Sequence, residues 1–145
     1  MENAQDLMIE NYVTIDGKIC EVVSISNRDL ECHSLDKRSI YHYPIHHLQG
    51  IPLTPELLLK LGFEQGRYEW KKNEFQKFVH GDCYLTMYHN FKENTFSSYY
   101  GSRQSTSGAD CFIDTQYRIA DIEYLHQMQN VFYTLTGQSL TVKFE

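Results

Sequence analysis

The sequence has little of the features that mark several large classes of protein. It contains no run of about 18 apolar residues, so no helix is predicted to cross a membrane. Basic residues are outnumbered, because 13 Lys and Arg face 19 Asp and Glu and give a formal net charge of −6. Proteins that bind nucleic-acid polymers collect positive charge, so neither DNA nor RNA is an expected partner.

Closely spaced cysteine pairs and nucleotide-binding motifs are also lacking, and no leader is expected. The four cysteines, Cys20, Cys32, Cys83 and Cys111, form no C-x-x-C motif. Residues 1–6 are polar and acidic, which gives no secretory signal in the chain as given. We therefore expect reduced thiols in a cytoplasmic protein, with two disulfides as the alternative. The pattern G-x-x-x-x-G-K is absent, and no cofactor is expected.

Aromatic residues are abundant by contrast. They make up 14% of the chain, and 11 of them are tyrosines. Tyrosine has a large apolar face and a polar tip, which suits both half-exposed strands and binding surfaces.

The first fifty residues have the pattern of a small antiparallel sheet. Strands are predicted at residues 12–15, 19–25, 30–34 and 39–43. Asp16-Gly17 suits a tight hairpin, and Pro44 ends the last of these strands. Short strands joined by tight turns favour an SH3-like barrel or roll over residues 1–53.

Two helices are predicted, one short and one long. For residues 54–61, Thr54 is a suitable N-cap, Pro55 fits the first turn and Gly62 suits the C-terminus. For residues 121–136, Asp121 is the expected cap, and an apolar stripe follows at three- and four-residue steps. Between the helices, strands are expected over about residues 68–119, including one at Tyr68-Glu69-Trp70. The predicted fold is therefore α+β, with subdomains at 1–53 and 54–145 forming one compact unit and the long helix packing on the second sheet.

The leading candidate site is the segment 99–108, which we interpret as a loop without buried residues. A nucleotide-like ligand needs a flat surface for stacking, a cation for its phosphate and nearby hydrogen-bond donors. The segment offers all three. Its predicted ligand-binding residues are Tyr99, Tyr100, Ser102, Arg103, Ser105, Thr106 and Ser107. The alternative interpretation is an ordinary hairpin loop.

Three weaker patterns are also present. His42 and His46 have the spacing of half a zinc site, but surface histidines are the favoured interpretation and no metal is expected. His80-Gly81-Asp82-Cys83 brings nucleophile-type residues together, although the position of Cys83 in a strand favours a buried structural thiol. The long helix carries His126, Gln127, Gln129 and Asn130, either as a partner surface or as a face covered by strands.

Four stretches share one pattern: Asn11-Tyr12-Val13 with Gly17-Lys18, residues 51–63, residues 124–130 and residues 135–137. This pattern resembles a group of short uncharacterised proteins of Bacteroidetes and of the phages and prophages of those bacteria. The shared residues are caps, turns and apolar stripes, so the resemblance transfers no catalytic residue. It implies a small accessory protein. By analogy, some proteins of that kind neutralise host defence.

These observations leave three functional hypotheses. The first is a non-enzymatic phage-type protein that sequesters a small anionic nucleotide-like ligand, such as a host immune signal, within one chain or between subunits of a homo-oligomer. The second is a protein-interaction module that inhibits or adapts a host protein. The third is a small hydrolase that uses His80 and Cys83.

Overall fold

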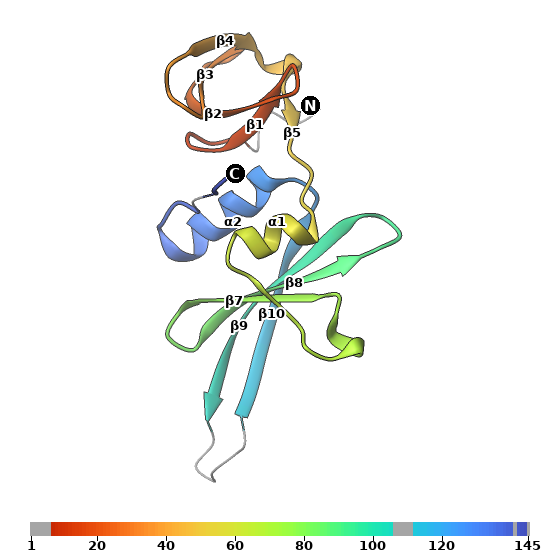
Figure 1. The fold of residues 1–145 in the computed structure, drawn as a ribbon. Helices are drawn as coiled ribbons and strands as arrows, with labels where there is room; N and C mark the ends of the chain where they lie inside the picture. Colours follow the sequence, from red (N-terminus) through yellow and green to blue (C-terminus); the bar gives the residue numbers. More distant parts are fainter. Residues whose placement is uncertain (1–6, 106–111, 141, 145) are drawn as a thin grey trace. The chain divides into compact units, whose positions relative to one another are not determined.

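The computed structural model describes residues 7–105, 112–140 and 142–144, and its fold is α+β (Figure 1). It contains two five-stranded sheets, and every pairing between their strands is antiparallel. Contacts divide the chain into two units: Met1–Pro52 with Tyr124–Leu140, and Leu53–Glu123 with Thr141–Glu145. The long helix is grouped with the first sheet, whereas the sequence pattern suggested packing on the second.

The first unit holds a sheet of order β4-β3-β2-β1-β5. Its strands are β1 (Tyr12–Ile15), β2 (Lys18–Ile25), β3 (Asp29–Ser34), β4 (Ile40–Pro44) and β5 (Gln49–Gly50). The hairpin between β1 and β2 turns at Asp16 and Gly17, where φ is 48° and 78°, as the sequence predicted. The short 3-10 helix η2 (Ile45–His47) precedes β5. Among the described residues β4 and β5 do not pair, so a closed SH3-like barrel is not confirmed.

Helix α2 (Leu125–Thr136) belongs to the first unit. Its end matches the prediction, since Gly137 is left-handed with φ 70°. The predicted start at Asp121 is wrong, because the chain remains in strand β10 up to Ile122. The carboxylate of Asp121 instead accepts a hydrogen bond from Arg118 at 2.7 Å. The helix begins after Tyr124, whose N–H donates to Gln127 Oε1 at 3.0 Å.

The second unit begins with helix α1 (Pro55–Lys60), as predicted. Thr54 Oγ1 accepts a hydrogen bond from the Leu57 N–H at 3.1 Å, which caps the first turn. Gly62 follows the helix with φ 88°, so the chain leaves in the left-handed conformation. Leu58 is fully buried and Leu61 is 3% exposed, which places an apolar face of the helix in the core.

The second sheet has the order β10-β9-β8-β7-β6. Its strands are β6 (Glu64–Gln65), β7 (Glu74–His80), β8 (Cys83–Asn90), β9 (Thr95–Ser105) and β10 (Phe112–Ile122). Figure 1 shows β9 and β10 as a long two-stranded ribbon. The predicted strand at residues 68–70 is wrong, because Glu69–Lys71 form the 3-10 helix η3.

The two faces of the second sheet differ in chemistry. The alternation predicted for β8 is confirmed by the pairing register, which places Leu85 and Met87 on one face and Tyr84 and Thr86 on the other. The first face carries buried apolar residues of four strands: Phe75, Leu85, Met87, Phe96 and Ile122. The other is a polar face, on which Gln76 Nε2 donates to Thr86 Oγ1 at 3.4 Å.

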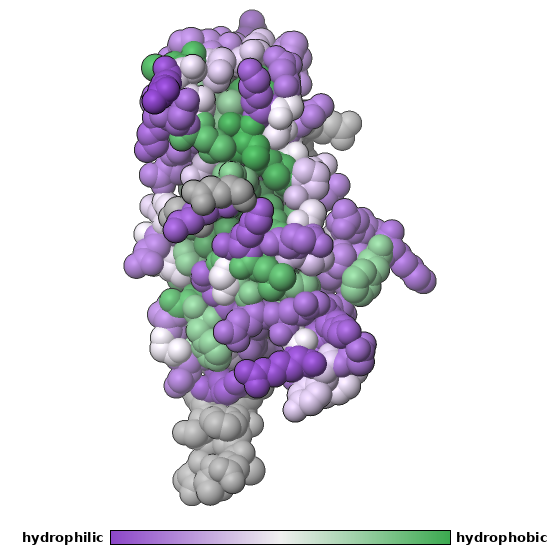
Figure 2. Space-filling model, viewed as in Figure 1, coloured by the Kyte–Doolittle hydropathy of each residue, from purple (hydrophilic) through white to green (hydrophobic). Residues whose placement is uncertain are grey.

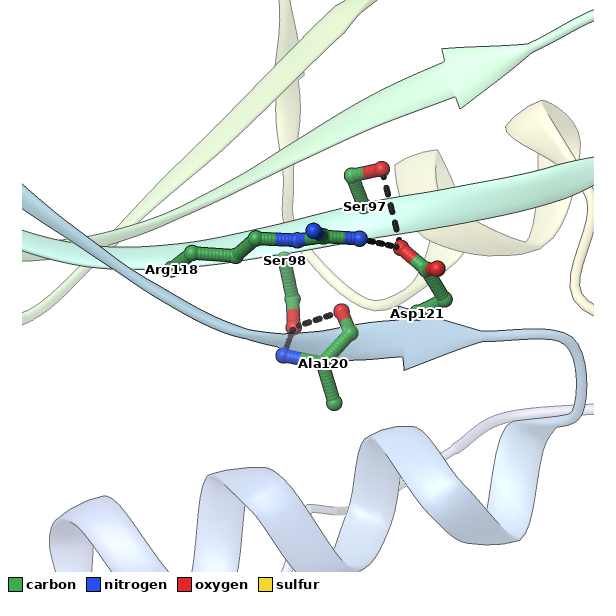
Figure 3. Close-up of polar contacts among 5 residues, drawn as sticks. All are labelled: Ser97, Ser98, Arg118, Ala120 and Asp121. Carbon is green, nitrogen blue, oxygen red and sulfur yellow. Dashed lines mark hydrogen bonds and ion pairs between the residues drawn. The ribbon is translucent and has the colours of Figure 1, made fainter.

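A β-bulge interrupts the ribbon of β9 and β10, because the register shifts between Arg118 and Ala120. The buried Ser98 side chain bonds across this interruption, as Figure 3 shows. Its hydroxyl donates to the Ala120 carbonyl at 2.7 Å and accepts from the Ala120 N–H at 3.2 Å. The Ser98 hydroxyl therefore bonds the backbone N–H and carbonyl of Ala120 at the point where the β9–β10 pairing is distorted.

Hydrophilic residues cover most of the face drawn in Figure 2, and apolar residues reach the surface around the first sheet. The exposed apolar side chains of the first unit include Ile9 and Ile40, at 60% and 58% exposure. In the part of the chain that the structure describes, no helix is long and apolar enough to span a bilayer.

Candidate functional site

The structure separates the residues predicted to bind a ligand. Residues 99–105 are not a loop, because they continue strand β9 and pair with β8 or β10, and Gly101 among them is buried. Alternation along the strand places Tyr99 and Arg103 on the polar face, and Tyr100 and Ser102 on the opposite face. These four side chains therefore cannot all surround one ligand. Ser105 is the last residue of β9, while Thr106 and Ser107 lie outside the described residues.

Arg103, one of the residues predicted to bind a ligand, lines a pocket. Its guanidinium carbon lies 5.7 Å from the ring centre of Tyr84 and 6.0 Å from that of Phe78. Its backbone N–H donates to the Asp82 carbonyl at 2.9 Å. Cation–π contact with two rings and a fixed backbone limit where the guanidinium can lie. Tyr99, on the same face, packs its ring edge-on against Tyr88, 5.3 Å between centres.

The pocket beside Arg103, here called the Arg103 pocket, has a volume of about 300 Å³. It lies between the polar face of the second sheet and the segment 64–71. Three cations line it (Arg67, Lys71 and Arg103), together with two carboxylates (Glu64 and Glu74) and the uncharged residues Gln65, Gly66, Tyr68 and Gln76. Such a lining offers charge for an anion and both donors and acceptors for a polar ring.

The segment that forms the outer wall is fixed by its own backbone. The Gly66 N–H donates to the Glu74 carbonyl at 2.9 Å, and the Lys71 N–H donates to the Tyr68 carbonyl at 2.8 Å. Gln65 Nε2 donates a hydrogen bond to the Lys72 carbonyl at 2.6 Å, which joins the two ends of the segment. A Cβ on Gly66 would overlap the Lys71 carbonyl oxygen, so the close approach of these backbones requires glycine.

Two exposed aromatic side chains stand at the outer wall. Tyr68 is 62% exposed and Trp70 is 74% exposed. Their rings stack with centres 5.6 Å apart and planes 8° from parallel. Lys71 Nζ lies 4.9 Å from the centre of the Trp70 ring. An exposed, flat aromatic surface beside cations can accept a second flat group with attached anionic charge.

The residues of this wall are absent from the predicted site, although the sequence contains a signal for them. Arg67, Lys71 and Lys72 fall within six residues, interleaved with Tyr68 and the single tryptophan of the chain. Basic residues interleaved with aromatics are typical of surfaces that stack and neutralise nucleotides. The prediction of a strand at residues 68–70 concealed this cluster.

Two polar residues of α2 contact residues 10–12 of the same unit and do not form an open surface. Gln129 is 5% exposed, and its amide accepts from the Tyr12 N–H at 2.9 Å and donates to the Glu10 carbonyl at 3.1 Å. Asn11 Nδ2 donates to Asn130 Oδ1 at 2.9 Å. Gln129 and Asn130 therefore belong to a helix face that is covered by another segment of the same chain, and not to an open partner surface.

The histidine pattern of the first sheet gives no ligand cluster. His42 Nδ1 lies 3.4 Å from Glu31 Oε1, and the rings of His46 and His47 are 4.5 Å apart. Over the described ranges of the chain, no group of three or more His, Cys, Asp or Glu side chains could hold a metal ion.

Three cysteines are described, and all three are free thiols. Cys20 and Cys32 are buried in the first unit, where burial raises the pKa of both thiols, that of Cys32 to about 12. Cys83 is only partly buried, so its predicted burial is wrong. Cys111 lies outside the described residues.

A larger groove of about 390 Å³ lies in the first unit, along Met8, Ile9, Tyr133 and Leu140. Among the described residues that line it, the titratable ones are Glu10 and Tyr133 and none is a cation. It therefore lacks the charge that an anionic ligand needs. The Arg103 pocket is smaller but chemically better suited to that class of ligand.

Comparison with known proteins gives no relative from which to transfer a role: no family model, no curated protein and no solved structure matches the chain.

Proposed function

We propose that this protein is a non-enzymatic binding protein that holds a small anionic, nucleotide-like ligand in the Arg103 pocket. The observation that carries the proposal is the convergence of Arg67, Lys71 and Arg103 on one pocket of a chain whose net charge is −6. A local cluster of cations in an acidic protein selects a small anion and does not attract a nucleic-acid polymer.

Each part of the pocket has a role in this proposal. Arg103 and Arg67 bind phosphate oxygens, since a guanidinium can donate two parallel hydrogen bonds to them. The exposed ring of Tyr68 stacks on the base. Gln65, Gln76 and the two carboxylates offer hydrogen bonds to the base edge or to sugar hydroxyls.

The biological consequence belongs to the same proposal. A protein that binds a nucleotide without converting it lowers the free concentration of that nucleotide. Such sequestration, directed at a host immune signal, would suit a small phage-type accessory protein of the cytoplasm. The SH3-like character of the first sheet and a homo-oligomeric state are further parts of this proposal, and size measurement with and without ligand tests the latter.

The test is titration calorimetry of the full chain against mono-, di- and cyclic nucleotides. We expect heat with at least one of them. Arg103→Ala should weaken that binding by about 5- to 150-fold, as expected for the loss of a charged hydrogen bond. The matched control is Arg118→Ala, which removes the same charge from an exposed arginine that does not line the pocket. Absence of heat with the whole panel would rule the proposal out.

A second candidate function is docking on a host protein, and the groove along Met8, Ile9 and Tyr133 favours it. Met8, Ile9 and Tyr133 are 40%, 60% and 47% exposed, and exposed apolar residues that cluster are typical of interaction surfaces. Recovery of one stoichiometric host protein, lost in Tyr133→Ala but retained in Arg103→Ala, would favour docking over nucleotide binding.

A further inference from the structure

Apart from its cations, the Arg103 pocket is lined mainly by hydrogen-bond acceptors. Glu64 and Glu74 end in carboxylates, which accept hydrogen bonds and donate none when they are ionised. Gln65 and Gln76 each donate a hydrogen bond from Nε2 to an oxygen of the protein, at 2.6 Å and 3.4 Å. Each amide therefore uses its donor nitrogen within the protein, and the polar groups left for a ligand are chiefly acceptors.

The two carboxylates of the pocket are not paired within the part of the chain that the structure describes. There, neither Glu64 nor Glu74 makes an ion pair or a side-chain hydrogen bond. Glu64 is exposed and Glu74 is half-buried. The carboxylates therefore do not neutralise the cations that line the same pocket, and their oxygens can accept hydrogen bonds from a ligand.

Glu74 and the Arg103 guanidinium lie toward opposite ends of the pocket. Glu74, Gln76 and Phe78 follow one another on the polar face of β7, because alternate residues of a strand share a face. The guanidinium carbon of Arg103 lies 6.0 Å from the centre of the Phe78 ring. Phe78 is four residues along the strand from Glu74, a distance of about 13 Å in extended chain. The pocket therefore suits a ligand with an anionic group at one end and hydrogen-bond donors at the other.

Among the common bases, guanine has the edge that fits an acceptor. Its N1–H and its 2-amino group are neighbouring donors, so one carboxylate can accept from both through two parallel hydrogen bonds. The corresponding edges of adenine and cytosine place an acceptor nitrogen beside a single amino group, and uracil places its N–H between two carbonyl oxygens. A carboxylate facing any of these three edges meets lone pairs that repel it.

We propose that the Arg103 pocket selects guanine nucleotides and that Glu74 determines this specificity, an inference that rests on the nucleotide binding proposed above. Glu74 accepts hydrogen bonds from the N1–H and the 2-amino group of the base, while Arg103 binds the phosphate at the other end of the pocket. Glu64 lies opposite Gln76 in the pairing of β6 with β7, between these two ends, and accepts from the sugar hydroxyls.

The experiment compares purine monophosphates that differ only at C2 of the base. Guanosine monophosphate carries an amino group there, inosine monophosphate a hydrogen and xanthosine monophosphate an oxygen. In titration calorimetry of the full chain, we expect guanosine monophosphate to bind about 5-fold or more tightly than inosine monophosphate. Xanthosine monophosphate should bind more weakly still, because its C2 oxygen faces a carboxylate. If only di- or cyclic nucleotides bind, the same three bases are compared in that form.

The role of Glu74 is tested with Glu74→Gln, which keeps the size of the side chain and replaces one acceptor oxygen by an amide nitrogen. We expect the preference for guanosine over inosine monophosphate to disappear and the affinity for xanthosine monophosphate to rise several-fold. Glu64→Gln is the matched control, since it removes the same charge from the same pocket. It should change the affinities for all three nucleotides alike and leave their ratios unchanged.

The outcomes separate base specificity from nucleotide binding itself. If nucleotides bind but guanine has no advantage over hypoxanthine, the specificity proposal is wrong and the binding proposal stands. The same holds if Glu74→Gln keeps the advantage, or if Glu64→Gln removes it as well. The comparison of bases on the unaltered chain decides the first point even if the Glu74 variant does not fold. If no nucleotide binds, the proposed function is wrong, and this inference is wrong with it.

Discussion

Lys77 donates a hydrogen bond from its ammonium group to the Leu61 carbonyl oxygen at 2.7 Å. The lysine lies on β7 and the carbonyl closes helix α1, so a strand side chain binds the negative end of the helix. Partial burial lowers the pKa of Lys77, and the carbonyl is a partner for the charge that burial disfavours. This contact connects α1 to the sheet.

Gly62→Ala should destabilise the protein by about 1–2 kcal/mol or more. Gly62 has φ 88°, and a Cβ there would lie 2.8 Å from Lys77 Nζ. The control is Gly81→Ala, where φ is also positive but nothing lies within 4 Å. Urea unfolding should show a larger loss for Gly62→Ala, and the excess should shrink when Lys77→Met is added. Equal losses for the two glycines would contradict the contact.

Ser98→Ala should cost about 1–3 kcal/mol, because it removes both hydrogen bonds that join the bulge at Ala120. Ser98 is fully buried, so water does not replace these bonds. The matched control is Ser97→Ala, which removes an exposed hydroxyl that donates to Asp121 at 3.1 Å. Thermal unfolding should separate the two variants clearly. A Ser98→Ala variant as stable as Ser97→Ala would show that the bulge does not depend on this side chain.

The features predicted correctly from the sequence are those with local causes. Thr54, Pro55 and Gly62 set the ends of α1 through contacts within a few residues. The extent of β9 has a nonlocal cause, because residues 101–105 are held in a strand by pairing with residues 112–116. The predicted start of α2 is wrong for a similar reason. Asp121 suits an N-cap, but it pairs with Ser97 and forms an ion pair with Arg118, and these contacts keep it in β10.

The candidate site was predicted only in part, and alternation explains the result. Arg103 lies in a charged pocket, but strand geometry turns Tyr100 and Ser102 away from it. The partner wall at Arg67, Tyr68 and Lys71 lies more than thirty residues earlier, and sheet pairing brings it close. Without the order of the strands, no local pattern joins these two stretches.

Gln129→Leu should destabilise the protein by about 1–3 kcal/mol. Leucine has a similar size but cannot accept from the Tyr12 N–H or donate to the Glu10 carbonyl. Thr134→Ala, at an exposed position of the same helix, should change stability by no more than about 0.5 kcal/mol. Denaturant unfolding followed by circular dichroism measures both. A neutral Gln129→Leu would mean that α2 is held to the N-terminal segment by apolar contact alone.

Stability should fall at alkaline pH through the buried thiols. The folded-state pKa of Cys32, about 12, lies above its ordinary value of 9.0, chiefly because of burial and then because of the nearby Cys20 thiol. The stabilisation from the neutral thiol is therefore complete below pH 9 and is lost as the pH rises toward 12. The free energy of unfolding should decrease between pH 9 and 10, before the tyrosines ionise, and Cys32→Val should lessen that decrease. Parallel pH curves for the two proteins would contradict this assignment.

The fluorescence of Trp70 should be sensitive to the surface beside the Arg103 pocket and insensitive to unfolding. It is the single tryptophan and is 74% exposed, so its emission should resemble that of tryptophan in water and change little in urea. Iodide should quench it efficiently, because Lys71 Nζ lies 4.9 Å from the ring and attracts the anion. Tyr68→Ala should increase quenching by neutral acrylamide, since it uncovers the stacked face of the ring. A blue-shifted emission that resists both quenchers would instead show that another chain covers this surface in solution.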